Sequence, residues 1–282
     1  MNAPTETATS TGRYVLGHSQ RELDRLKSQA RVTDPITKRF FRDAGVAEGM
    51  RVLDVGSGAG DVAFLAADLV GTRGTVVGID RVSAAIDEAR RRVAARSMSN
   101  VTFHVGDPAA FKFDTLFDAI VGRYVLQFQN DPAAMLRQLA THVRPGGLIV
   151  FHEIDWGGVG SFPTVPTYDR ACGWGRDALR LHGTETRMGA KLYAAFVGAG
   201  LRPPTMRLQA LVGGGSNATD ILSLLVGVIE TLLPAIERLG VATAADVDIG
   251  TLVERIQKEV DDSRSIVIGP NQISAWVRMQ AA

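Results

Sequence analysis

The chain has little of what would mark a secreted or metal-binding protein. Cys172 is the only cysteine among 282 residues, so neither an intramolecular disulfide nor a cysteine metal cage can form. Residues 1–11 are rich in alanine and threonine and contain no apolar run, so they do not read as a signal peptide. Because free thiols persist in a reducing compartment, we expect a cytoplasmic protein.

The chain also has no large excess of positive or negative charge. The 31 basic and 30 acidic residues leave a formal net charge of +1, which provides no general attraction to nucleic acid or to anionic lipid. We therefore expect no nucleic-acid partner. The most apolar stretch, residues 221–233, is interrupted by Glu230 and followed by Pro234. A run of this length is too short to cross a bilayer, so we also expect no membrane span.

What the sequence does contain is an alternation of short apolar runs and amphipathic segments. Near-continuous Val/Ile/Leu runs separated by helical periods predict a parallel sheet with helices on both faces. The carboxyl ends of all its strands then lie along one edge, where ligands bind. The predicted strands are 50–55, 75–80, 101–106, 117–121, 148–154, 206–212, 266–268 and 273–279; the predicted helices are 61–69, 83–97, 132–143, 188–199, 218–239 and 250–262.

Three further segments interrupt this alternation. Residues 19–44 have a helical pattern, and Pro35 predicts a break between two helices there. Residues 156–186 carry glycines, prolines and aromatics with little clear period, and residues 213–215 are three glycines that predict a loop.

A glycine-rich turn follows the first strand, where residues 51–61 read RVLDVGSGAGD. Glycines at 56, 58 and 60 let the backbone turn tightly and approach a ligand without Cβ clashes. A dinucleotide fingerprint has its third glycine one position later, where Asp61 stands. A carboxylate repels a pyrophosphate but attracts an ammonium group, so the turn favours a ligand with an ammonium end.

Two more acids follow neighbouring strands. Asp80 ends the second strand, 20 residues after Gly60 (80 − 60), which is the spacing at which an acid reaches both hydroxyls of a ribose. Asp107 follows the third strand and can accept a hydrogen bond from an adenine amino group. The three strand ends together indicate one extended ligand with an amino-acid end, a ribose and an adenine.

This ordered set resembles the class I S-adenosylmethionine (SAM)-dependent methyltransferases, near the ubiquinone/menaquinone-biosynthesis type. Asp54, Gly56, Gly58 and Gly60 match the family's first motif; residues 117–121 resemble its fourth strand, and residues 144–147 (RPGG) the turn before the fifth. The resemblance covers about residues 45–155 and, loosely, the last strands. It implies a three-layer α/β Rossmann-like fold whose mostly parallel sheet has seven strands, the last antiparallel, and a largely helical cap insertion.

The resemblance also implies SAM as cofactor, S-adenosylhomocysteine (SAH) as product, and specific residue roles. The Gly56 and Gly58 backbones face the methionine part, Asp80 holds the ribose, and Asp107 with Ala109 holds the adenine. Arg123 lines the methionine end by its backbone, and the N-terminal segment with Tyr14, His18 and Gln29 covers the cofactor. The implied cofactor-binding residues are Tyr14, Gln29, Asp54, Gly56, Ser57, Gly58, Gly60, Asp80, Arg81, Gly106, Asp107, Pro108, Ala109 and Arg123.

Catalytic candidates stand at the end of the fifth strand: His152, Glu153 and Asp155. Side chains alternate along a strand, so Glu153 and Asp155 share one face and His152 points to the other. This argues against a three-ligand metal site, and we expect no metal. Glu153 or Asp155 would act as a general base only for an acceptor that carries a proton at neutral pH; the alternative is a carboxylate that anchors the next loop.

The segments after Asp155 predict the acceptor side. Helix 218–239 is apolar nearly all round and must be buried, either as plain core, as the roof of a greasy pocket, or against a second subunit, which leaves a homodimer open. Trp156, Tyr168 and Trp174 form an aromatic pocket or a small core, and Arg176 and His182 are further candidates for acceptor contact. The expected divisions are 1–45 over the cofactor, 46–155 as SAM-binding core, 156–186 and 216–262 as cap, and 187–215 with 263–282 completing the sheet.

A cap favours a small-to-medium organic methyl acceptor over a folded macromolecule. Two alternatives stay open at this point: a SAM-binding protein that does not methylate, and an NAD-dependent oxidoreductase, against which Asp61 argues. RNA methylation rests only on the basic residues of segment 21–42 and is disfavoured by the neutral overall charge.

Overall fold

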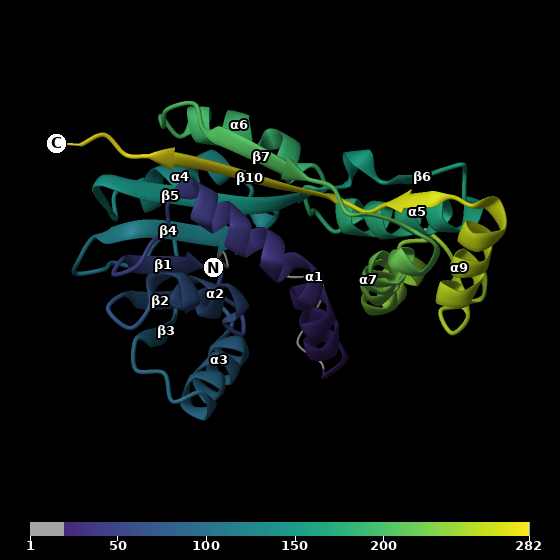
Figure 1. Ribbon diagram of the computed structural model, residues 1–282, viewed down its shortest axis with the longest axis horizontal. Coiled ribbons are helices and arrows are strands. Elements are labelled where there is room, and N and C mark those ends of the chain that lie inside the picture. Colours follow the sequence, from purple (N-terminus) through teal and green to yellow (C-terminus); the bar gives the residue numbers. More distant parts are fainter. Residues whose placement is uncertain (1–19, 282) are drawn as a thin grey trace, which may run out of the picture.

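A twisted sheet with helices on both faces forms one half of the molecule, and a smaller helical layer extends from its edge (Figure 1). The computed structural model describes residues 20–281, with side chains from residue 30 onward. The main sheet has the order β3-β2-β1-β4-β5-β10-β7. Its strands are β1 (Arg51–Val55), β2 (Thr75–Asp80), β3 (Val101–Val105), β4 (Phe117–Arg123), β5 (Val143–Asp155), β7 (Thr205–Gln209) and β10 (Asn271–Arg278).

The sheet confirms the predicted seven strands with the last one antiparallel. Strands β1 to β5 pair in parallel, whereas β10 runs antiparallel to both β5 and β7. The register of β10 brings Gln272 opposite Ile154 and Ser274 opposite His152. The carboxyl ends of β1, β2, β4 and β5 therefore meet at one edge, next to the start of β10.

Helices cover both faces, which explains why the strands are apolar throughout. On one face, Val52 packs in a cluster with Phe41; on the other, Leu53 packs in a cluster with Phe196. The first face is covered by α1 (Gln20–Ala44), α2 (Asp61–Val70) and α3 (Ser83–Ala95), and the second by α4 (Pro132–Ala140) and α6 (Met188–Gly198).

The predicted break at Pro35 is wrong, because α1 is a single helix with Pro35 inside it. A proline removes one backbone hydrogen bond and bends a helix, and Figure 1 shows α1 bending along its length. The helix continues because Ile36, Phe40 and Phe41 are buried against the sheet.

The cap has its own apolar core and a second sheet that the sequence did not predict. Its sheet has the order β6-β9-β8. Helix α5 occupies the segment in which the sequence shows no clear period. The sequence did not predict this helix because Gly173 and Gly175, which are typical of loops, lie inside it. The cap elements are β6 (Gly160–Phe162), α5 (Pro166–Leu181), β8 (Val212–Gly214), α7 (Thr219–Arg238), α8 (Ala244–Val247), α9 (Leu252–Ser263) and β9 (Ile266–Ile268), with short 3-10 turns η2 (Trp156–Gly158) and η3 (Gly215–Ala218). A further 3-10 turn, η1 (Leu126–Phe128), follows β4 in the sheet half.

The predicted loop at residues 213–215 is also wrong in part, because Gly213 and Gly214 belong to β8. A Cβ on Gly213 would stand 2.3 Å from the Asn217 carbonyl oxygen, so the close packing of strand and turn requires glycine there. The triple glycine reflects tight packing as well as turn formation.

Helix α7 continues through Pro234, in agreement with the predicted helix 218–239. Leu232, Ala235 and Ile236 are buried around the proline and hold the helix together. By length and composition alone, residues 215–238 would pass as a membrane-crossing helix. In the described structure α7 packs against α5 and α9 within the cap core, and buried helices of water-soluble proteins have the same composition.

Candidate functional site: a two-ended cavity

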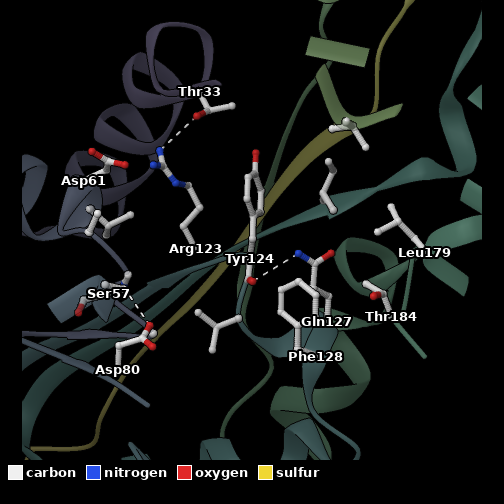
Figure 2. Close-up of a pocket in the computed structure, with 18 of the residues that line it drawn as sticks. Thr33, Ser57, Asp61, Asp80, Arg123, Tyr124, Gln127, Phe128, Leu179 and Thr184 are labelled. Atoms are coloured by element: carbon white, nitrogen blue, oxygen red, sulfur yellow. Dashed lines mark hydrogen bonds between the residues drawn. The ribbon is translucent and has the colours of Figure 1, made fainter. Parts of the chain in front are cut away.

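One cavity of about 580 Å³ joins the strand ends of the sheet to the cap. This size is typical of pockets for small organic ligands, which span roughly 300–1,000 Å³. Figure 2 shows Ser57, Asp61, Asp80 and Arg123 on one side of Tyr124, with Gln127, Phe128, Leu179 and Thr184 on the other. The first group comes from the sheet half and the second from η1 and the cap, so the cavity has two chemically different ends.

The glycine turn forms the wall of the first end. Gly56 and Gly58 have φ of +64° and +51°, in the left-handed region that favours glycine. A Cβ on Gly56 would lie 2.8 Å from Val125 Cγ2, whereas a Cβ on Gly58 would point into open space. Gly58 therefore presents bare backbone to the cavity, while Gly56 permits the turn to pack against the end of β4.

Asp80 fastens the glycine turn to the end of β2. Its Oδ2 accepts the Gly58 N–H at 2.9 Å and its Oδ1 accepts the Val82 N–H at 2.9 Å. The carboxylate is half-buried on the cavity wall. Since each carboxylate oxygen can accept two hydrogen bonds, each retains acceptor capacity for ligand hydroxyls.

Asp54 lies beneath the glycine turn and is fully buried. Burial raises the pKa of this carboxyl well above its usual range, although the Arg123 guanidinium opposes the shift. The two Asp54 oxygens have no hydrogen-bond partner among the described residues, and neither does the hydroxyl of Ser57, three positions further along the chain. Buried polar atoms of this kind call for a donor such as a bound cation or an ordered water.

Asp61 is the first residue of α2, lies on the cavity wall and forms an ion pair with Arg92. Arg92 donates to Asp61 Oδ1 at 2.6 Å and to the Ala59 carbonyl at 2.6 Å. The arginine thus holds both the acid and Ala59 of the turn. Asp61 still supplies negative charge at the helix start, which is unfavourable for a pyrophosphate.

The acid after the third strand stands next to the cavity, not on its wall. Asp107 Oδ1 accepts the Ala109 N–H at 2.9 Å, and its Oδ2 accepts from Arg81 Nη2 at 2.8 Å. Arg81 and Pro108 line the cavity themselves. Asp107, Ala109 and Gly106 therefore shape the far end of the wall through Arg81 and Pro108.

The Arg123 side chain binds α1, and the backbone role that the resemblance implies stays a prediction. Its Nη1 donates to Asp34 Oδ1 at 2.7 Å, to Thr37 Oγ1 at 3.0 Å and to Thr33 Oγ1 at 3.2 Å. The buried guanidinium ties α1 to the end of β4, and Thr33 joins the cavity wall. Burial raises the pKa of Asp34, while Arg123 opposes that shift. Tyr14 and His18 lie outside the described residues, as does the side chain of Gln29.

Tyr124 stands where the two ends meet and has an unusual backbone, with φ of +59°. Left-handed non-glycine residues concentrate at functional sites. The Tyr124 hydroxyl donates to Gln272 Oε1, and Gln272 Nε2 donates to the Pro270 carbonyl at 2.9 Å. The Pro270 contact fixes which way the amide points, so Gln272 Oε1 is an acceptor for Tyr124.

His152 lies behind this pair, not on the cavity wall. Its Nε2 is 3.0 Å from Gln272 Oε1 and its Nδ1 is 3.0 Å from Thr37 Oγ1. Because Gln272 Oε1 accepts, we assign the ring proton to Nε2. Burial, reinforced by the Arg123 charge, lowers the pKa of His152 to about 3. The imidazole is therefore neutral and orients Gln272, and it lies off the cavity wall.

Glu153 and Asp155 also face away from the cavity and anchor neighbouring segments. Glu153 Oε1 accepts the Val125 N–H at 2.9 Å and the Leu126 N–H at 2.8 Å, which holds the start of η1. Burial raises the pKa of Glu153 to about 8. Asp155 accepts the Gly157 N–H at 2.7 Å and the Ala190 N–H at 3.2 Å. Both carboxyls match the loop-anchoring alternative, because neither lies on the wall.

The second end of the cavity is built by the cap. Trp156 and Tyr168 line it, whereas Trp174 packs in the cap core. Arg176 pairs with Asp177, and His182 contacts Arg238, so neither reaches the cavity. The wall of this end consists of Tyr124, Val125, Gln127, Phe128, Gln129, Met135, Ile154, Trp156, Tyr168, Leu179, Thr184, Leu211, Ile221, Leu224, Leu225, Val228, Pro270 and Gln272.

Several of these residues carried no signal in the sequence. Tyr124 follows a strand end, which is where functional residues gather in such sheets, so its position could have singled it out. Thr33, Gln127 and Gln272 are ordinary polar residues in helix, turn and strand. Only the folded arrangement brings Gln272 beside Tyr124, 148 positions away in the chain.

The SAM that the resemblance implies fits the first end by its chemistry. The orphaned Asp54 oxygens suit an ammonium group, directly or through water, and Asp80 suits a ribose. Gly58 leaves bare backbone toward the cavity. A dinucleotide pyrophosphate would instead meet Asp61 and Asp80 on the wall beside the turn.

Comparison with known proteins gives the same picture. A family model described as a methyltransferase domain matches residues 47–165. Aklanonic acid methyltransferase of Streptomyces sp. is 34% identical over 133 residues, covering 47% of this chain and 60% of that protein. Demethylmenaquinone methyltransferase of Staphylococcus aureus is 33% identical over 132 residues, covering 46% of this chain and 52% of that protein. The chain therefore spans somewhat more than half the length of these relatives.

A solved structure extends the likeness in fold to most of the chain. The crystal structure of a putative methyltransferase from Bacillus halodurans aligns with a TM-score of 0.57 and 16% identity, covering 87% of this chain and 99% of that one. This likeness concerns the fold alone. The family match, the curated relatives and the sheet order together place the domain of residues 47–165 in the class I SAM-dependent methyltransferases.

Proposed function

We propose that the chain transfers a methyl group from SAM to a small-to-medium organic acceptor held under the cap. The observation that carries this proposal is the continuity of the cavity, which has Gly58 and Asp80 at one end and the cap helices at the other. In this proposal residues 46–155 bind the cofactor, and residues 156–186 and 216–262 enclose the acceptor.

The residues at the first end would hold the cofactor. Asp80 would accept hydrogen bonds from the ribose hydroxyls, and Arg81 with Pro108 would border the adenine. Asp54 would meet the ammonium group, directly or through water, beneath the Gly56–Gly58 backbone. Bound there, SAM would supply an electrophilic methyl group on a positively charged sulfur.

The chain's own contribution would be positioning and exclusion of water. Holding two reactants in line supplies a large part of the rate of a displacement, and a low-dielectric wall favours a reaction in which a charge disappears. Tyr124 and η1 stand between the two ends, held by Glu153 and Gln272. Cytoplasmic location and a homodimer remain predictions from the sequence.

Calorimetric titration with SAM, SAH and NADH tests the cofactor directly. We expect heat and thermal stabilisation with SAM and SAH but none with NADH. The absence of SAH binding, or NADH binding of equal affinity, would overturn the proposal. Formation of SAH in mixtures of SAM with a small-molecule extract then separates a methyltransferase from a protein that binds SAM without turnover.

A further inference from the structure

Charge is divided sharply along the cavity wall. Among the described residues, every ionised lining side chain comes from positions up to Arg123, and all those after it are neutral. The chain passes from the charged to the neutral wall between Arg123 and Tyr124, which are consecutive residues. The ionised lining residues are Asp61, Asp80, Arg81, Glu88, Arg91 and Arg123.

Helix α7 supplies an apolar stripe to the neutral end. Ile221, Leu224, Leu225 and Val228 are spaced three, four and seven positions apart and line the cavity together. This is the spacing of one helix face. Leu222 and Ile229, on the adjoining face of α7, are buried in the cap core. The helix therefore has one broad apolar surface, which contributes to the cap core and also lines the cavity.

Polar groups at the neutral end are hydroxyls and amides. Gln127 and Thr184 lie together on the wall (Figure 2), and Gln272 lies beside Tyr124. The Gln127 amide donates to the Tyr124 carbonyl at 3.3 Å, and both amides keep a fixed orientation. These groups satisfy a hydroxyl or carbonyl by ordinary hydrogen bonds and provide no counter-charge to an ion.

We propose that the acceptor is an uncharged molecule with an apolar body and a hydroxyl or carbonyl end. The inference rests on the proposed function and names its substrate class. An ion placed against the α7 stripe loses its hydration and gains no opposite charge from the described lining residues, which is strongly unfavourable. A neutral polar end keeps its hydrogen bonds at Gln127, Thr184 or Gln272, while the apolar body is driven to the stripe by the hydrophobic effect.

Three probes with the same body and different charge test this class. Naphthylmethanol is neutral, naphthoate is an anion, and naphthylmethylammonium is a cation. Each is titrated into the full chain saturated with SAH, and binding is followed by calorimetry. We expect naphthylmethanol to bind at least about tenfold more tightly than either ion. Equal or tighter binding of an ion would overturn the inference.

A matched pair of variants shows whether the probes occupy the neutral end. Val228→Asp and Val228→Asn add side chains of the same shape that differ in charge. At a pH above the pKa of the new carboxyl, naphthylmethylammonium should become the tightest probe for Val228→Asp, whereas Val228→Asn should keep the wild-type order. Unchanged order in Val228→Asp would overturn the inference. Leu224→Asp and Leu224→Asn, one turn earlier, repeat the comparison if Val228→Asp does not fold.

SAH titration of the unliganded chain distinguishes a failure of the proposed function from a failure of the acceptor inference. If SAH does not bind, the proposed function fails and the acceptor inference fails with it. If SAH binds but the probes show no preference for the neutral end group, only the acceptor inference is overturned.

Discussion

The two ends of the cavity differ in how they are built as well as in charge. The cofactor end consists of backbone and acids at strand tips: Gly58 lies in the turn after β1, and Asp80 ends β2. The acceptor end consists of side chains from η1, α5, α7 and β10, which the chain brings together over long separations. One end depends on local backbone geometry, the other on how helices pack.

This difference explains where the residues at the end of β5 act. The sequence presents three acid–base side chains here as catalytic candidates. In the structure His152 binds Gln272, Glu153 binds the start of η1, and Asp155 binds the segment after β5. They support the acceptor end at its border with the cofactor end, because η1 and Gln272 adjoin Tyr124 there. The following predictions test whether the two ends can be perturbed separately.

The largest effect is expected at the cofactor end. Asp80→Ala should weaken SAH binding by about 100-fold or more, since two charge-assisted hydrogen bonds of about 1.5 kcal/mol or more each are lost. Calorimetry measures the affinity, and Asp87→Ala, an exposed acid on α3 outside the cavity, is the control. A dissociation constant within threefold of wild type would remove Asp80 from the ribose site.

Glu153 tests the connection between the ends. Glu153→Leu should lower the free energy of unfolding by about 2–4 kcal/mol, because the Val125 and Leu126 N–H groups would remain buried without an acceptor. Glu153→Gln retains the carbonyl oxygen and should lose less than half as much. Denaturant unfolding measures both. Equal losses would mean that the two hydrogen bonds do not hold η1.

The same residue predicts a dependence of stability on pH. Burial raises the pKa of Glu153 to about 8 from an ordinary 4.5, so the folded chain keeps a proton that the unfolded chain releases between these pH values. Its contribution to stability is complete below about pH 4.5 and is lost as the pH rises toward about 8.

Glu153→Gln cannot ionise, so its stability relative to wild type should improve steadily from about pH 5 to about pH 8. Taking the difference between the two proteins removes the shared contribution of His152, whose pKa is lowered. A difference that does not change with pH would contradict the raised pKa.

The smallest effect on the cofactor is expected from the acceptor end. Leu224→Ala should leave SAH affinity within about twofold of wild type and weaken naphthylmethanol binding by about threefold to tenfold. The loss arises because the variant buries less apolar area against the probe, and each Å² of buried apolar area contributes about 25 cal/mol. Leu233→Ala, on the same helix but off the cavity, should change neither. A large loss of SAH affinity in Leu224→Ala would show that the ends are not independent.

The sequence by itself determined the main sheet and the composition of the cofactor end. Runs of apolar residues specify parallel strands, and a parallel sheet necessarily brings the residues after β1, β2 and β4 to one edge. Gly56, Gly58 and Asp80 could therefore be placed without knowing any long-range contact, because each lies within a few residues of a strand that the pattern already defines.

Only the tertiary structure decided the acceptor end and the roles of the polar residues around it. Nothing local distinguishes Glu153 as a base from Glu153 as an anchor, since its role depends on the Val125 and Leu126 N–H groups that the fold brings to its carboxyl. The glycines inside α5 kept the sequence from predicting that helix, and Pro35 led to the prediction of two helices where α1 is continuous. The pairing of Tyr124 with Gln272 depends on β10 inserting antiparallel beside β5. These features result from packing between distant segments, which overrides the local preferences that a sequence displays.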